Sequence, residues 1–201
     1  MRVLHLIDSG GLYGAERVLL SLVEEQRRIG IAAAIVSIGE PGIVEKPLER
    51  AAREIGTLVH PFRMLPGPNP VGALRLLGVA RRERADVLHS HGFKANVLLA
   101  FLPRRWRCIP MVSTLHGYTG GARVGRMRLY EWADRRALGR MDRVVLVHGG
   151  MLRDPRLARL RDSRWSVIEN GIDLDLALEA SKVDEGVARF CAAGPTLGAV
   201  G

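Results

Sequence analysis

The chain has 201 residues, of which 47% are hydrophobic and 25% are charged, and these proportions are typical of a globular domain with a core of its own. They exclude a mostly disordered chain. The longest apolar run, residues 95–102, contains an asparagine and is far shorter than the roughly 20 residues that a membrane-spanning helix needs. The apolar stretch before Asp8 is too short for a secretory signal, so we expect neither feature.

The net charge is +9, and the 30 basic residues include only three lysines, Lys46, Lys94 and Lys182. A positive surface favours anionic partners such as phosphorylated small molecules, nucleic acid or an acidic membrane face. Aromatic residues make up only 5%, and no cluster interleaves them with arginine, so we expect no nucleic-acid binding. Cys108 and Cys191 lack metal-ligand spacing, which predicts buried or idle cysteines in a reducing cytoplasm.

Short apolar runs alternate with amphipathic stretches along the chain. The pattern predicts strands at 3–7, 32–38, 57–62, 86–90, 111–115, 143–148 and 165–168. It predicts helices at 15–29, 44–55, 71–84, 93–102, 126–140 and 151–161, with loops at the proline-rich 61–70 and the glycine-rich 117–125. Because the strands are apolar on both faces, we expect an α/β fold with a doubly wound, Rossmann-like parallel sheet.

A glycine-rich segment follows the first predicted strand. In an open parallel sheet, ligands bind beyond the carboxyl ends of the strands. Gly10, Gly11 and Gly14 stand there, before a helix start whose free N–H groups would suit a phosphate. The nicotinamide pattern G-x-G-x-x-G fails because Ser9 occupies its first position, although Glu40 keeps a dinucleotide-binding oxidoreductase open as an alternative. A plain tight turn is the other interpretation of these glycines.

Histidines follow the ends of two neighbouring strands: His89 and His91 at the fourth and His116 at the fifth. Their location favours a functional role for His116 over that of a satisfied structural residue. We expect alternation along the strand to turn His89 and His91 toward opposite faces. Further zinc ligands at suitable spacing are missing, so we predict no metal site.

Several segments, taken in order, are similar to one known family. They are Gly-Gly-Leu-Tyr-Gly-Ala-Glu-Arg at 10–17, Asp-Val-Leu-His-Ser-His at 86–91, Val-Ser-Thr-Leu-His-Gly at 112–117, segments 128–132 and 142–147, and Val-Ile-Glu-Asn-Gly-Ile-Asp at 167–173. Their order and spacing resemble the N-terminal domain of a retaining family-4 glycosyltransferase with the GT-B fold. The chain departs from that family at two points, an extra Leu12-Tyr13 in the first loop and His148 where serine is usual.

The resemblance implies that the enzyme transfers a sugar from a nucleoside-diphosphate sugar to an acceptor hydroxyl with retention, without a cofactor or a metal. It implies that His116 contacts the donor sugar near the reacting carbon. Gly10, Gly11 and Gly14 would face the donor diphosphate. Glu16 stands in the first turn of the helix, where a carboxylate suits the dipole, and we interpret it as mainly structural.

The resemblance also implies an acceptor side lined by Tyr13, His91 and Lys94, and a turn at the cleft floor formed by Asn170 and Gly171. The acceptor would be a glycan or a lipid-linked molecule in envelope or exopolysaccharide synthesis. A cytoplasmic chain attached to the inner face of the plasma membrane fits the positive charge. Segments 101–107 and 123–140 are the candidate contacts with an anionic membrane surface, and a solvated arginine-rich face is the alternative.

The resemblance divides the chain into three parts. We expect residues 1–173 to form the N-terminal domain, 174–193 a linker or bridging helix, and 194–201 the first strand of a truncated nucleotide-sugar-binding domain. A last strand docked on the sheet edge is the alternative for 194–201. On the first interpretation this chain is about half of an enzyme and is inactive alone. A stand-alone module that binds a phosphorylated or lipid ligand is the remaining alternative.

Overall fold

The computed structural model describes residues 1–8, 10–67, 69–117, 126–155, 157 and 164–171, and the isolated positions 186, 189, 192 and 194. For residues 126–130 it describes the backbone alone. The chain divides into two compact units, Met1–Asn170 and Gly171–Gly201, and the sheet lies in the first. The expected linker and the expected strand at 194–201 fall almost entirely outside the described residues.

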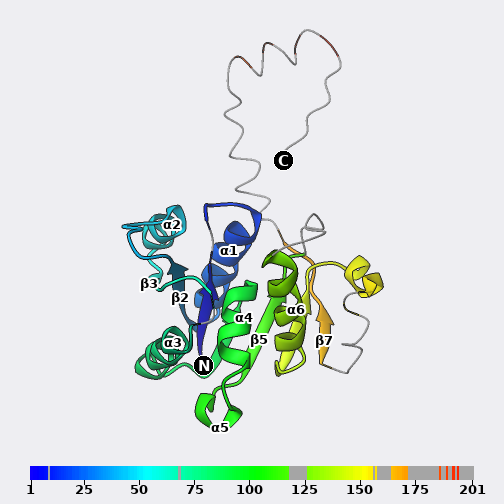
Figure 1. Ribbon diagram of the computed structural model, residues 1–201. Helices are drawn as coiled ribbons and strands as arrows, with labels where there is room; N and C mark the ends of the chain where they lie inside the picture. Colours follow the sequence, from blue (N-terminus) through cyan, green and yellow to red (C-terminus); the bar gives the residue numbers. More distant parts are fainter. Residues whose placement is uncertain are drawn as a thin grey trace. The chain divides into compact units, whose positions relative to one another are not determined.

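Seven parallel strands form one sheet in the order β3-β2-β1-β4-β5-β6-β7 (Figure 1). The strands are β1 (Arg2–Ile7), β2 (Ala32–Gly39), β3 (Leu58–Arg63), β4 (Val87–Ser90), β5 (Met111–Leu115), β6 (Arg143–Leu146) and β7 (Trp165–Val167). All seven predicted strands are therefore present, and the expected Rossmann-like parallel sheet is confirmed. The strand order changes direction between β1 and β4, and such a switch point is where open α/β sheets bind ligands.

Helices connect the strands and cover both faces of the sheet (Figure 1). They are α1 (Gly14–Arg28), α2 (Pro47–Glu54), α3 (Pro70–Arg82), α4 (Phe93–Ala100), α5 (Arg104–Arg107), α6 (Arg126–Leu138) and the 3-10 helix η1 (Gly149–Arg153). The helix predicted at 44–55 begins only at Pro47, because Pro is favoured in the first turn and the residue before it is held extended.

The helix predicted at 151–161 is wrong as far as the structure describes that segment. The described residues of this segment contain the 3-10 helix η1 and single 3-10 positions at 155 and 157, but no α-helix. The backbone of Asp154, the residue after η1, is extended with ψ 117°. Asp154 precedes Pro155, and the proline ring disfavours the α conformation at the residue before it. Residues 158–163 of this prediction lie outside the described part of the chain.

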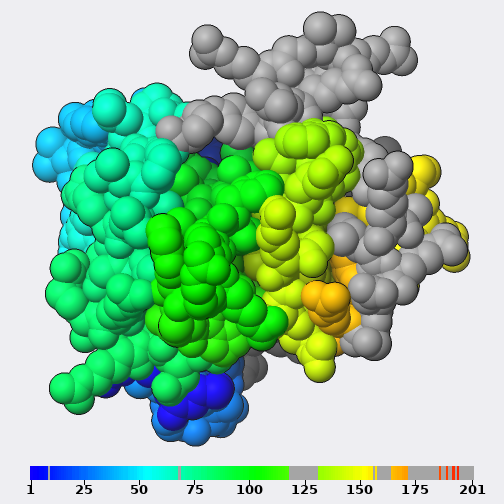
Figure 2. Space-filling model, turned by 60° about the horizontal axis from the view of Figure 1, so that its bottom comes forward, coloured from blue at the N-terminus to red at the C-terminus, as the bar shows by residue number. Residues whose placement is uncertain are grey.

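Two hydrophobic cores lie on the two faces of the sheet. The larger one packs β1, β4 and β5 against α3, α4 and α6, which share the face seen in Figure 2. The smaller one packs the other face against α1 and α2. Side chains alternate across each strand, so Leu4 and Leu6 of β1 join the larger core, whereas Ile7 joins the α1 side. His5 shares the α1 side with Ile7.

No helix in the described part of the chain is both long and apolar enough to cross a membrane.

Candidate functional site

The candidate site lies at the carboxyl ends of β1, β4 and β5. The β1 and β4 strands pair in register from Val3 opposite Val87 to Leu6 opposite Ser90, so both end at the same edge of the sheet. The His91 N–H continues this pairing and donates to the Leu6 carbonyl at 2.9 Å. The first residues after these strands are thereby brought together by the sheet itself.

Four of the six histidines gather at this edge, and we call them the histidine cluster. The ring centroids are 4.2 Å apart for His89 and His91, and 5.8 Å apart for His91 and His116. The His5 ring lies 5.1 Å from His89 and 5.2 Å from His91. The cluster contains both histidines that the resemblance assigns to the site, together with two that it does not.

The expectation that His89 and His91 point to opposite faces is wrong. Their rings lie side by side on the α1 face of the sheet. Alternation separates neighbouring residues, and residues two apart along a strand share a face. The same rule brings His5 of β1, which pairs with His89, to that face.

Hydrogen bonds connect three of these rings in a chain that starts at helix α1. His5 Nε2 lies 2.8 Å from Gln26 Oε1, and His5 Nδ1 lies 3.0 Å from His91 Nε2. His91 Nδ1 lies 3.5 Å from His116 Nε2. Because the Gln26 amide oxygen faces His5 Nε2, it accepts from His5 Nε2–H, which leaves His5 Nδ1 without a proton. His5 Nδ1 then accepts from His91 Nε2–H, and His91 Nδ1 accepts from His116 Nε2–H.

Burial keeps the cluster uncharged near neutral pH. It lowers the pKa of His5 to about 4 and that of His89 to about 3, and it lowers the pKa of His91 well below its ordinary value. Burial also lowers the pKa of His116, against a smaller opposing effect of the Glu16 carboxylate. A neutral His116 ring can exchange a hydrogen bond with a hydroxyl group but brings no positive charge to a diphosphate.

The cluster also bears on the metal prediction. His5, His89 and His91 each offer one ring nitrogen, and these three atoms lie within 4.8 Å of one another. Neutral imidazoles are good zinc ligands. However, His5 and His91 already share a hydrogen bond, and His89 Nε2 lies 2.8 Å from Thr114 Oγ1. That no metal is required stays a prediction.

The glycine loop and the start of α1 stand beside the cluster. The Tyr13 N–H donates to Glu16 Oε2 at 2.8 Å, and Glu16 is only 6% exposed, so this carboxylate closes the first turn of the helix. A Cβ atom at Gly11 would lie 2.7 Å from the Tyr13 ring, which gives Gly11 a packing reason to be glycine. Gly10 and Gly14 face open space, and their role toward a diphosphate stays a prediction.

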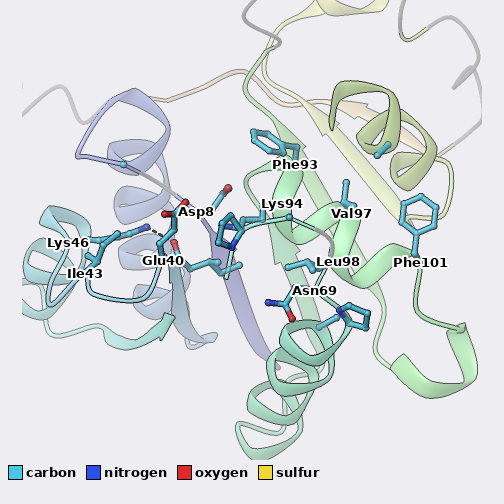
Figure 3. Close-up of a pocket in the computed structure, with 18 of the residues that line it drawn as sticks. Asp8, Glu40, Ile43, Lys46, Asn69, Phe93, Lys94, Val97, Leu98 and Phe101 are labelled. Atoms are coloured by element: carbon cyan, nitrogen blue, oxygen red, sulfur yellow. Dashed lines mark hydrogen bonds between the residues drawn. The ribbon is translucent and has the colours of Figure 1, made fainter. Parts of the chain in front are cut away.

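A cavity of about 1160 Å³ opens beside the ends of β1 and β2 (Figure 3). One wall is α4, and the others come from the segments that lead into α2 and α3. Most of the lining is apolar, and the charged side chains are at one end. The lining includes Asp8, Gly10, Ile38, Glu40, Ile43, Lys46, Pro66, Asn69, Ala73, Phe93, Lys94, Val97, Leu98, Phe101 and Leu102.

Three charged residues of this cavity were not found from the sequence, Asp8, Glu45 and Lys46. Burial raises the pKa of Asp8, while the charges of Lys94 and Lys46 oppose that effect. Burial lowers the pKa of Lys46, whose ammonium donates to the Ile38 carbonyl. A Cβ atom at Gly92 would lie 2.5 Å from Asp8 Oδ1, so the carboxyl group fits only over a glycine. The available signal for Asp8 was its place directly after β1.

The structure brings some of the predicted site residues together and leaves others apart. His91 and His116 are neighbours in the cluster, and Lys94 lines the cavity together with Gly10. Tyr13 is 70% exposed. The cleft-turn residues Asn170 and Gly171 are exposed residues of irregular backbone that follow β7, the edge strand, and Gly171 is the first residue of the second unit.

The fold is a Rossmann-like domain of the kind found in GT-B glycosyltransferases. The chain belongs to Glycosyltransferase Family 4, whose family model matches residues 13–176. No curated protein sequence matches the chain.

Solved structures share the fold at low sequence identity. HepE from Anabaena, in complex with UDP, superposes with a TM-score of 0.69 at 18% identity, over 88% of this chain and 46% of that one. A glycosyltransferase from Rickettsia africae gives 0.61 at 17%, over 96% and 48%. A UDP-GlcNAc 2-epimerase from Neisseria meningitidis, bound to UDP-GlcNAc, gives 0.59 at 15%, over 97% and 54%. The chain thus spans about half the length of these proteins.

Proposed function

We propose that this chain forms the acceptor-side half of a retaining glycosyltransferase that uses a nucleoside-diphosphate sugar. The observation that carries the proposal is the meeting of His91 and His116 at the switch point, beside the glycine loop. Family membership supports sugar transfer. The UDP bound to HepE and the UDP-GlcNAc bound to the epimerase support a nucleotide-sugar donor.

Transfer breaks the bond between the anomeric carbon and the diphosphate oxygen, and forms a bond to the acceptor oxygen on the same face. The acceptor proton leaves with the nucleoside diphosphate. Positive charge develops on the sugar and negative charge on the diphosphate, and catalysis consists largely of stabilising both. The positive end of the α1 helix dipole suits the diphosphate, and the neutral His116 ring holds a sugar hydroxyl. The reaction as proposed requires neither a cofactor nor a metal.

We assign the acceptor to the cavity beside α4 and place the reaction at the inner face of the plasma membrane. An aromatic and basic surface supports this location. Phe101 and Trp132 are 46% and 47% exposed, with the guanidinium carbon of Arg140 4.6 Å from the Phe101 ring centroid and that of Arg136 4.8 Å from that of Trp132. An apolar and positively charged patch is what an anionic lipid surface attracts. Envelope glycans and exopolysaccharides are the product classes that fit.

The test is a transfer assay with the complete protein that contains this chain. The protein is incubated with a panel of nucleoside-diphosphate sugars, and the nucleoside diphosphate released is measured. We expect one donor to be consumed, and NMR of the product to show the anomeric configuration of the donor. An inverted product would contradict retention. Titration with NAD tests the oxidoreductase alternative, and tight NAD binding without sugar release would favour it.

A further inference from the structure

The cavity beside α4 has two unlike ends. Asp8, Lys46 and Lys94 lie at one end, close to the glycine loop, and Phe101 lies at the other (Figure 3). Its volume of about 1160 Å³ is slightly above the roughly 300–1,000 Å³ that is typical of ligand pockets. A ligand that reaches from one end to the other is therefore expected to be polar at one end and apolar at the other.

The apolar end is built by one face of α4. Phe93, Val97, Leu98 and Phe101 line the cavity, at the spacing that places side chains on one side of a helix. Ile43 and prolines of the facing segments line other walls. Such walls stabilise an alkyl or prenyl chain by removing its surface from water, but they provide little that could hold a polysaccharide.

The charged end carries both hydrogen-bond donors and acceptors. Asp8 is partly buried and is affected by the charges of Lys94 and Lys46, and Glu40 lines the same end. Carboxyl groups accept from hydroxyls and ammonium groups donate to them, so this mixed set suits a hydroxyl-bearing head better than a bare anion.

The apolar end of the cavity leads to the aromatic and basic surface. Phe101 lines the cavity and is also 46% exposed beneath Arg140. Three residues further on, α5 begins with Arg104, whose side chain is 83% exposed and pairs with Asp142. The apolar chain of a ligand that leaves the cavity at Phe101 therefore emerges next to cationic side chains. These side chains are suited to contact the headgroups of an anionic lipid layer.

We propose that the acceptor is an amphiphile, with a hydroxyl-bearing head between Asp8 and Lys94 and an apolar chain that runs along α4 to Phe101. That the ligand is the acceptor rests on the proposed function, whereas the cavity and its two unlike ends are properties of this chain. It selects a lipid-linked molecule over a soluble glycan.

The experiment measures binding of alkyl glucosides of increasing chain length to this chain by calorimetry, below the concentrations at which they form micelles. Glucose is the probe for the head alone. We expect glucose to bind weakly, and each added methylene to strengthen binding by about fourfold until the apolar end is filled. Affinity that does not depend on chain length would overturn the proposal, as would glucose binding as tightly as the longest glucoside.

Two variants with one control assign the binding to this cavity. Val97→Trp places an indole in the apolar end and is expected to weaken binding of a long-chain glucoside by about tenfold. Lys94→Met keeps the apolar stem and removes the head contact, which should weaken every glucoside by about fivefold without changing the gain per methylene. Leu74→Trp, on the exposed side of α3, should leave binding unchanged. An equal loss with Val97→Trp and Leu74→Trp would mean that detergent binds elsewhere.

Thermal unfolding of each variant shows whether the fold is kept. The binding measurement uses no sugar donor, so its outcome is independent of transfer. Chain-length-dependent binding without any transfer activity would reject the proposed function and keep the cavity assignment. Transfer to soluble glycans, with no affinity for alkyl chains, would support the proposed function and reject the cavity assignment.

Discussion

His5 occupies a fully buried position on β1, where most parallel strands carry an aliphatic residue. A buried imidazole is costly unless both ring nitrogens have partners. Gln26 and His91 supply them at 2.8 and 3.0 Å. This arrangement also affects His116, because the proton positions on His5 and His91 determine whether His116 Nε2, which faces His91 Nδ1, carries a proton.

We expect the free energy of unfolding to start to fall with decreasing pH above the pH range in which carboxylates titrate. The native pKa values of His5 and His89, about 4 and 3, lie below those of an unfolded chain near 6.5. Between these limits the unfolded chain binds protons that the native one does not, so stability is complete above pH 6.5 and is lost toward pH 4. Urea unfolding at pH 7.5, 6.0 and 5.0 measures this, and equal stability at all three would contradict the buried neutral rings.

The order of protons along the cluster can be read from ring-nitrogen NMR with labelled histidine. We expect His5 and His91 to carry their protons at Nε2, since Gln26 accepts from the first and His5 from the second. His5→Phe should change the ring signals of His116. His89→Gln is the matched control, because His89 touches the same rings but bonds to Thr114. A proton on His91 Nδ1 would contradict this order.

At the scale of elements, the strands were predictable and the shortest helices were not. Seven apolar runs gave seven strands, because a parallel strand buried on both faces leaves a continuous apolar pattern. The α5 helix, Arg104–Arg107, is a single turn and is too short to show a period. The sequence placed His116 after a strand end and Lys94 on the acceptor side, and their roles there stay predictions. Asp8 and Lys46 were not found, because they come from distant segments that the fold alone brings to one cavity with Lys94.

An ion pair ties α2 to β3 and gives a prediction about this edge of the sheet. The Glu49 side chain is fully buried and lies 2.8 Å from Arg63 Nη1. Burial would raise the pKa of Glu49, but hydrogen bonds from Arg63 and others hold it below its usual value. Arg63→Met leaves a buried carboxylate without its partner, which should cost about 3 kcal/mol in the free energy of unfolding at pH 7.

The control for that variant is Arg50→Met. Arg50 is an exposed residue of α2, the helix that carries Glu49, and it pairs with Glu45. Exposed ion pairs contribute little to the free energy of unfolding, so this variant should unfold at nearly the same urea concentration as the wild type. Equal effects of the two substitutions would show that the Glu49–Arg63 pair does not hold α2 on the sheet.

At the scale of the whole molecule, the net charge of +9 and the aromatic and basic surface predict salt-sensitive membrane binding. Vesicles with anionic lipid should sediment the chain at low salt and release it at high salt, because screening weakens the attraction. Arg104→Gln combined with Arg140→Gln should reduce sedimentation more than Arg28→Gln on α1 does. Equal binding to neutral vesicles would contradict an electrostatic origin.

We propose that sugar transfer depends on His116, which lies at the sheet edge formed by β1, β4 and β5. The most direct measurement is donor-dependent release of nucleoside diphosphate by the complete protein and by two variants. His116→Ala should lower turnover by at least about 100-fold while the unfolding temperature stays near that of the wild type. His148→Ala, at the end of the neighbouring strand β6, should keep most of its activity. Unchanged turnover in His116→Ala, or an equal loss in His148→Ala, would contradict the account.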